Sequence, residues 1–314
     1  MALDQASFES AKQAYTQGDD VLSIQRFEAY LNNYAQGRYR LEAHYFLSEI
    51  FWRQQNVEQA LLHVDPVISS DENPSYVIPT LIRMARHYLS TVEFDLAKST
   101  LIRLLDQPLT TNQRTFALRN LMQMTSDGAR WQEAIEYAGQ LSDHLSPGGD
   151  AALLAQAQLI SAWSQFELGA FESARQQYEG LDTLASGQYA AQLALARAYF
   201  AHLDQDYSGS NALIQKLAQN YANYGRFSAR GLLLMAQNFE ALSDEFQARF
   251  ILENIRDNMQ DFPELQQEAI DRLAAMDRLK SDAQMSRKDS VNTSLNEVKP
   301  LDSQGPNTNN EDEQ

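Results

Sequence analysis

The amino-acid sequence predicts an all-α protein: an α-solenoid of about seven helical hairpins closed by a C-terminal capping helix. A small residue inside a helix-forming segment returns at intervals of 36 to 40 residues, and a period in this range is typical of stacked repeats. The seven positions are Ser23, Ala60, Ala97, Ala134, Ala174, Ser210 and Ala248. Gly (13) and Pro (8) are scarce among the 314 residues, which favours helix.

Each unit is predicted to consist of a helix, a short turn, a second helix and a longer loop. In the fifth unit the first helix covers 153–166, and Gly169 can take the left-handed conformation that ends it. The second helix then carries an apolar stripe at the spacing of one buried face, made of Phe171, Ala174, Tyr178 and Leu181. Gly18 has the same turn position in the first unit, whereas Gln55 and Asn56 take it in the second.

The small residue is expected where the two helices of a hairpin cross most closely, because only Ala, Ser or Gly lets the backbones approach. A second small position lies twelve residues earlier, on the first helix. It is filled by Ala11, Ser48, Ala85, Ala162, Ala198 and Ala236. The fourth unit has Met122 at this position, so looser or locally rearranged packing is expected there.

The C-terminal part is predicted to hold one more helix and a tail. Residues 263–279 have an apolar side that can cover the exposed face of the last hairpin. From Ser281 the chain is polar, contains Pro300 and Pro306, and reaches the acidic run at 311–313. Such a segment cannot bury enough apolar area to offset the entropy of ordering it. The expected divisions are a repeat array over 4–260, a capping helix over 261–280 and a disordered acidic tail over 281–314.

Charge and cysteine content argue against several classes of function. The net charge is −17 and the pI is near 4.6, and Lys and Arg form no cluster that could neutralise a row of phosphates, so no nucleic-acid partner is expected. There are no cysteines, which excludes disulfides, thiolate metal sites and cysteine catalysis. No stretch approaches the roughly 18 to 20 apolar residues of a membrane span, so no membrane insertion is expected.

Motifs that would indicate an enzyme are missing from the sequence. The five histidines are scattered and form no His-Glu-x-x-His pair. Phosphate-binding Gly loops and the G-x-S-x-G nucleophile elbow do not occur either. We therefore expect no catalytic residues, no metal site and no cofactor.

The repeat resembles the tetratricopeptide repeat (TPR). That family shows a small residue on the first helix, an aromatic residue three positions later, a Gly turn and an Ala on the second helix. The aromatic position is filled here by Phe51, Tyr88 and Phe239 but not in the other units, and the period exceeds the family's ~34 residues by about three. The resemblance covers roughly 4–260 and implies a right-handed superhelix whose concave face binds a partner.

Two segments resemble repeats of bacterial cell-envelope proteins. Residues 229–249 look like the C-terminal repeats of long TPR proteins from Bacteroidetes-type bacteria, and 41–50 look like those of the Tol-Pal-associated coordinator and outer-membrane assembly lipoproteins. Such proteins are typically exported, so the resemblance implies the periplasm or cell envelope and a chain without its export signal. The sequence from Met1 has no signal-peptide pattern, and a native start there would indicate the cytoplasm.

The TPR resemblance also implies which side chains line the concave face. In that family, positions 2, 5, 9 and 12 of each first helix face the groove, and counting them here selects aromatic, Arg and Gln side chains suited to a peptide or helix. The expected partner-binding groove is Tyr45, Glu49, Trp52, Arg86, Arg119, Gln123, Trp163, Phe166, Tyr199 and His202. The same count includes Ile82 and Phe116. Exposure is expected for Trp52, Tyr199 and Arg119, whereas packing between adjacent helices is an equal alternative for Trp163 and Phe166.

These expectations lead to a non-catalytic scaffold that binds a protein or peptide partner in its groove, within a bacterial envelope assembly. The basic clamp by which chaperone-binding TPR proteins grip an acidic C-terminus is not recognisable, because Arg86 and Arg119 lack the accompanying Asn pattern. The alternative is a cytoplasmic ligand- or peptide-sensing regulator built on the same repeats, which would need an effector domain. An enzyme is the third hypothesis. Neither the partner nor the oligomeric state follows from the sequence.

Overall fold

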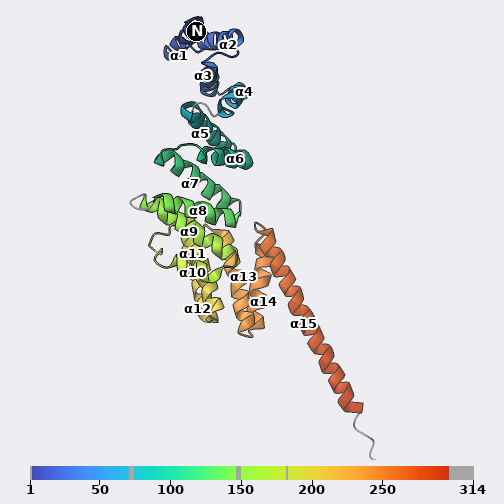
Figure 1. The fold of residues 1–314 in the computed structure, drawn as a ribbon. Helices are drawn as coiled ribbons and strands as arrows, with labels where there is room; N and C mark the ends of the chain where they lie inside the picture. Colours follow the sequence, from blue (N-terminus) through green and yellow to red (C-terminus); the bar gives the residue numbers. More distant parts are fainter. Residues whose placement is uncertain (1, 71–73, 146–149, 182, 297–314) are drawn as a thin grey trace, which may run out of the picture. The chain divides into compact units, whose positions relative to one another are not determined.

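The regular structure of the described residues is helical throughout. The computed structural model describes residues 2–70, 74–145, 150–181 and 183–296 (Figure 1). The chain divides into two compact units, Met1–Ala185 and Ser186–Gln314. We call them unit 1 and unit 2 and describe each by itself.

Unit 1 contains five helical hairpins. In each, the first helix packs against the second, and the second helices of the first four hairpins also pack on the first helix of the next hairpin. The hairpins are α1 (Ala2–Thr16) with α2 (Asp20–Asn33), α3 (Arg40–Arg53) with α4 (Val57–Ile68), α5 (Pro74–Ser90) with α6 (Phe94–Leu105), α7 (Thr111–Asp127) with α8 (Trp131–Leu145), and α9 (Ala151–Glu167) with α10 (Phe171–Tyr178). First helices of successive hairpins also meet, as α3 meets α5 and α7 meets α9.

Unit 2 continues the same design with two hairpins and a last helix. Its elements are α11 (Gly187–Leu203) with α12 (Tyr207–Asn220), α13 (Gly225–Ala241) with α14 (Glu245–Asn258), and α15 (Pro263–Asn296). α15 packs on α14 and α13 through the buried side chains of Leu265, Ala269 and Leu273. The predicted all-α fold of seven helical hairpins and a C-terminal helix is thus confirmed for the described residues.

The small residues lie at the crossings of the hairpins, as predicted. All seven on the second helices are 0 % exposed. Two of them show the crossing directly, because the Ser23 hydroxyl donates to the Ala11 carbonyl at 3.4 Å and the Ser210 hydroxyl donates to the Ala198 carbonyl at 2.7 Å. Met122 is also 0 % exposed, so the larger side chain is taken up inside the α7–α8 hairpin rather than expelled from it.

Each hairpin turn contains one residue in the left-handed region, five positions before the small residue of the second helix. Two of the seven are the predicted glycines, Gly18 (φ +76°) and Gly169 (φ +77°). The other five are Gln55, Val92, Ala129, Gln205 and Ser243, with φ between 54° and 63°. In every turn the next amide donates back to the carbonyl five residues earlier, as Asn56 does to Phe51 at 2.9 Å. This hydrogen bond ends the first helix in the Schellman pattern whichever residue occupies the turn.

The C-terminal helix differs from its predicted extent. The capping helix was expected over 261–280 and disorder over 281–314, but α15 continues to Asn296. The reason is that no Gly or Pro occurs between Pro263 and Pro300, so nothing in the backbone interrupts the helix. The rest of the predicted tail, 297–314, lies outside the described residues, and the division into array, cap and tail stays a prediction.

Candidate partner-binding site

Six side chains on the first helices of three successive hairpins form the candidate site. They come from α3, α5 and α7, all in unit 1, and they line two neighbouring hollows. We name this set the α3–α7 strip: Trp52, Ile82, Arg86, Phe116, Arg119 and Gln123. Four of the six are among the groove residues predicted from the sequence, and all six were selected by the positional count.

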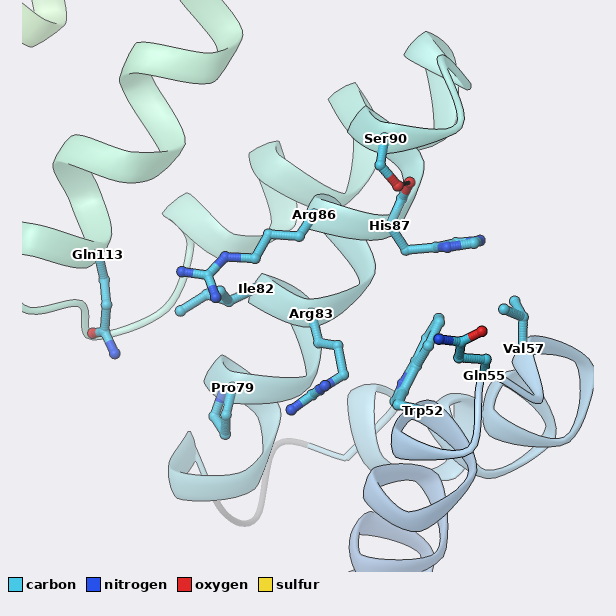
Figure 2. Close-up of a pocket in the computed structure, with 10 residues that line it drawn as sticks. All are labelled: Trp52, Gln55, Val57, Pro79, Ile82, Arg83, Arg86, His87, Ser90 and Gln113. Carbon is cyan, nitrogen blue, oxygen red and sulfur yellow. Dashed lines mark hydrogen bonds between the residues drawn. The ribbon is translucent and has the colours of Figure 1, made fainter.

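The first hollow has a volume of about 550 Å³ and lies where the end of α3 faces α5 and the start of α7. Figure 2 shows Trp52 on one side of it and Gln113 on the other, with side chains of α5 between them. Arg86 and Ile82 extend toward Gln113, and the guanidinium of Arg83 lies between Pro79 and Trp52 in this view (Figure 2). The hollow therefore combines apolar surface with guanidinium groups from one helix.

Trp52 is half-buried at one end of the strip. Its ring centroid lies 5.1 Å from that of His87, and it packs against the apolar cores on both sides. Its indole N–H is buried without a hydrogen-bond partner among the described residues. An unpaired buried donor costs about 1–3 kcal/mol, so this N–H lowers the stability of the fold at this point.

Arg86 lies at the centre of the strip and is held by an aromatic ring. Its guanidinium carbon is 5.4 Å from the centre of the Phe116 ring of α7. Such stacking orients the guanidinium and leaves its N–H donors available at its edge. In the part of the chain that the structure describes, Arg86 forms no ion pair, although its neighbour Arg83 does.

The second hollow, about 470 Å³, lies along α7. Arg119 lines it with an exposed side chain and, within the described ranges, forms no ion pair. Gln123 is half-buried and bonded at both ends of its amide, donating to Asp127 at 2.8 Å and accepting from Gln156 of α9 at 3.0 Å. Gln123 thus joins α7 to α9, while Arg119 stays available.

Tyr45 and Glu49, also predicted for the groove, contact the next hairpin instead of an open surface. The Tyr45 ring lies 4.9 Å from that of Tyr76, and burial, followed by the charge of Glu49, raises the pKa of Tyr45 to about 12. Glu49 accepts a hydrogen bond from Arg83 at 2.8 Å. These contacts tie α3 to α5 and neutralise Arg83.

Trp163 and Phe166 are buried on α9. Each is 3 % exposed, their rings stack at 5.1 Å, and Phe166 also meets Phe171 of α10 at 5.5 Å. The expectation that they line an accessible groove is therefore corrected in favour of the packing alternative. The reason is that these large apolar rings gain more from burial within the hairpin than from exposure.

Tyr199 and His202 belong to α11 of unit 2 and so form a separate cluster. Tyr199 is half-buried against the core of that unit rather than exposed. The Nδ1 of His202 donates to the Oδ1 of Asn238 at 2.6 Å. Asn238 is 0 % exposed and donates to Ser210 Oγ at 2.9 Å and to Asn211 Oδ1 at 2.7 Å. His202 is thus part of a buried hydrogen-bond network.

Unit 2 contains a larger hollow of about 880 Å³ between the α13–α14 turn and α15. Its charged side chains pair with one another: Arg272 with Glu240, and Lys280 with Glu245 at 3.7 Å. Both pairs join α15 to the preceding hairpin. The charges lining this hollow therefore belong to the docking of α15.

Sequence reasoning missed a contact between two histidines. The Nδ1 atoms of His44 on α3 and His63 on α4 lie 3.0 Å apart. Burial, followed by the neighbouring ring of His63, lowers the pKa of His44 to about 4, and burial lowers the pKa of His63. The two residues lie on different helices, so no spacing within one helix could indicate the pair. No group of three or more metal-ligating side chains occurs among the described residues.

None of the helices in the described ranges is long and apolar enough to cross a membrane. No protein-family model matches the chain, and no curated protein sequence matches it significantly.

Several solved structures are similar to the chain. A tetratricopeptide repeat protein from Parabacteroides merdae is 14 % identical over 86 % of this chain and 100 % of its own, with a TM-score of 0.41. PilF of Pseudomonas aeruginosa is 16 % identical over 73 % of this chain and 95 % of its own, with a TM-score of 0.42. The TPR domain of P58(IPK) is 13 % identical over 86 % of this chain and 89 % of its own, with a TM-score of 0.31. The stacked hairpins with small residues at their crossings give the chain a TPR-like fold.

Proposed function

We propose that this protein is a non-catalytic scaffold that binds a protein or peptide partner along the α3–α7 strip. The observation that carries the proposal is the combination, on one strip, of a half-buried Trp52 and an exposed Arg86 stacked on Phe116. Trp and Arg are the side chains that most often dominate binding energy at protein interfaces. Repeats of this kind present extended binding surfaces.

The proposal includes a place in a bacterial envelope assembly. Its support is the resemblance of residues 229–249 and 41–50 to repeats of exported envelope proteins. Fractionation of the native organism, with antibody against the chain, tests this part by itself. Recovery with the periplasmic or membrane fraction is expected, and recovery with the cytoplasm alone would contradict the envelope assignment while leaving the binding proposal intact.

Site-specific photo-crosslinking in the native cell tests the binding proposal. A photoreactive amino acid placed at Gln55 or Gln113, which line the first hollow, is expected to give the same discrete adduct. Placed at Gln140, an exposed residue of α8, it should not give that adduct. Adding Trp52→Ala or Arg86→Ala should lower the adduct yield roughly 10-fold, as for a residue that dominates an interface.

Arg130→Ala is the matched control for Arg86→Ala. Arg130 also lies in unit 1, but it pairs with Asp95 at 3.1 Å and does not line either hollow of the strip. Its replacement should leave the adduct unchanged, and all variants should keep the helical circular dichroism of the wild type. Adducts that are insensitive to both Trp52→Ala and Arg86→Ala would show that the strip is not the binding site.

A further inference from the structure

We propose that the occupant of the α3–α7 strip is an acidic segment of a partner protein, with one carboxylate at Arg86, a second at Arg119 and an apolar side chain in the hollow beside Trp52. This inference rests on the proposed function and assigns the chemistry of its partner. The proposed ligand groups are acidic side chains inside a segment of the partner. Their recognition does not require the C-terminal carboxylate of the partner chain.

The first argument is the charge of the strip. The whole chain carries 42 Asp and Glu against 25 Lys and Arg. Yet the charged side chains among the described residues that line the two hollows of the strip are Arg83, Arg86 and Arg119, without one carboxylate. Exposed charges are screened beyond about 8–10 Å at physiological salt, so a segment seated on the strip responds to these local cations more than to the distant acidic surface.

The second argument is that the cations differ in their partners. Arg83 is neutralised by Glu49 at 2.8 Å, as Arg130 is by Asp95 at 3.1 Å. Arg86 and Arg119 have no such ion pair among the described residues. A guanidinium with free donors on a partly desolvated surface is matched by a carboxylate, which can accept two parallel hydrogen bonds from it.

The third argument is the apolar surface beside the arginines. Ile82 and Trp52 line the first hollow, and the ring of Phe116 holds the guanidinium of Arg86 in place. A stacked guanidinium loses less conformational entropy when a ligand binds than a freely rotating one. The strip therefore matches an acidic segment that also carries an apolar or aromatic side chain.

The geometry indicates the spacing of the two acidic residues. The guanidinium carbon of Arg86 is 5.4 Å from the Phe116 ring, and Arg119 follows Phe116 by one helical turn, a rise of about 5 Å. An extended chain covers about 3.3 Å per residue, so a short segment can reach both cationic positions. We therefore expect the two acidic residues to lie within a few positions of one another.

Selection from a library of short random-sequence peptides, displayed on phage and bound to the full-length chain, tests the inference. Enriched peptides are expected to carry two acidic residues two to four positions apart and an apolar residue beside them. An enriched peptide, labelled with fluorescein and followed by anisotropy, should bind the Arg86→Glu/Arg119→Glu protein at least roughly 30-fold more weakly. Replacing its two acidic residues with Lys should restore binding to that protein, and Arg130→Glu should leave affinity unchanged.

The outcomes separate this inference from the proposed function. Neutral or basic peptides that lose affinity with Trp52→Ala would overturn the acidic partner but retain the scaffold. Peptides that bind the Trp52→Ala and Arg86→Ala proteins normally would overturn both. If the wild type self-associates in sedimentation velocity and the Arg86→Glu/Arg119→Glu protein does not, the occupant is a second copy of the chain, and the partner proposal is overturned.

Discussion

The α3–α7 strip of unit 1 and the hollow between α13 and α15 of unit 2 use arginine in opposite ways. On the strip, Arg86 is exposed, stacked on Phe116, and without an ion pair among the described residues. In unit 2, Arg272 is 21 % exposed and pairs with Glu240 of α13, which joins α15 to the hairpin before it. The unit 2 hollow is the larger of the two, about 880 Å³ against 550 Å³. Volume alone would therefore favour unit 2.

The difference teaches that the bonding state of the polar groups, rather than the size of a hollow, separates a binding surface from a packing interface. In unit 2 the side chains of Arg272 and Asn238 both have polar partners, Arg272 in a surface ion pair and Asn238 in a buried network. On the strip, Arg86 and Arg119 are exposed and form no ion pair among the described residues. Replacements in unit 2 should therefore reduce stability, and those on the strip should reduce binding.

The largest effect on stability is expected from Asn238→Leu. This side chain accepts from His202 and donates to Ser210 and Asn211 in a site that is fully buried. A leucine of similar size removes all three hydrogen bonds, which lowers the free energy of unfolding by about 3 kcal/mol. Urea denaturation measures the loss, and Asn254→Leu, at an exposed position of α14, should change it little. Equal effects of the two substitutions would contradict the structural role of the network.

Much of the fold could be predicted because the repeat period shows which residues occupy equivalent positions in successive hairpins. The small residues lie where the periodicity placed them, and all seven of those on the second helices are fully buried. What the sequence did not indicate is the left-handed residue in five of the seven turns, such as Val92 at φ +62°. Glycine is the usual signal for this conformation, and a β-branched residue argues against it. The only sequence signal for this conformation is position, because the left-handed residue lies five positions before the small residue of the second helix.

The site was less predictable, because position on a helix does not determine what a side chain contacts. Counting positions along the helices selected Trp52, Arg86 and Arg119 for the groove. It selected Glu49 as well, although the Glu49 carboxylate is paired with Arg83, which lies 34 residues further along the chain. The burial of Trp163 depends on how neighbouring helices pack. Long-range pairs such as these follow from tertiary packing, which a single sequence does not encode in its local pattern.

Acid should weaken unit 1 through the pair of His44 and His63. The pKa of His44 is lowered to about 4 and that of His63 is lowered as well, whereas histidine in an unfolded chain titrates near pH 6.5. As pH falls below this value, the unfolded state binds protons that the folded state does not, so stability declines toward pH 4. We expect the melting temperature to fall on the order of 3 °C between pH 7.5 and 5 from this pair. The fall should be smaller in His44→Leu/His63→Phe, and an unchanged slope would contradict the assignment.

Arg272→Ala should loosen the docking of α15 by about 1 kcal/mol, the upper end for partly exposed ion pairs. The ion pair with Glu240 is lost, and so is the contact of the arginine stem with the hollow. Hydrogen exchange read by mass spectrometry should show faster exchange in α15, around Leu273, than in the wild type. Arg278→Ala is the matched control, since Arg278 is exposed on the same helix and does not line the hollow. Equal exchange rates of α15 in the Arg272→Ala and Arg278→Ala proteins would show that the ion pair of Arg272 does not hold α15 in place. The contrast between unit 2 and the α3–α7 strip would then fail.

The smallest change in stability is expected from Arg86→Ala, about 0.5 kcal/mol or less. Among the described residues, Arg86 stacks on the Phe116 ring and forms no ion pair, and an exposed cation–π contact contributes about that amount. No carboxylate loses its partner, so no unpaired charge is left behind, in contrast to the loss of Arg272. Urea denaturation of Arg86→Ala and Arg272→Ala under the same conditions measures the difference directly.

A loss from Arg86→Ala as large as that from Asn238→Leu would mean that the arginine supports the fold of unit 1, and the contrast on which the binding assignment depends would fail. If Arg86→Ala keeps near-wild-type stability but gives less crosslinked adduct, Arg86 contributes to partner binding. The reason is that a substitution without effect on folding can lower the adduct yield only by weakening the contact with the partner.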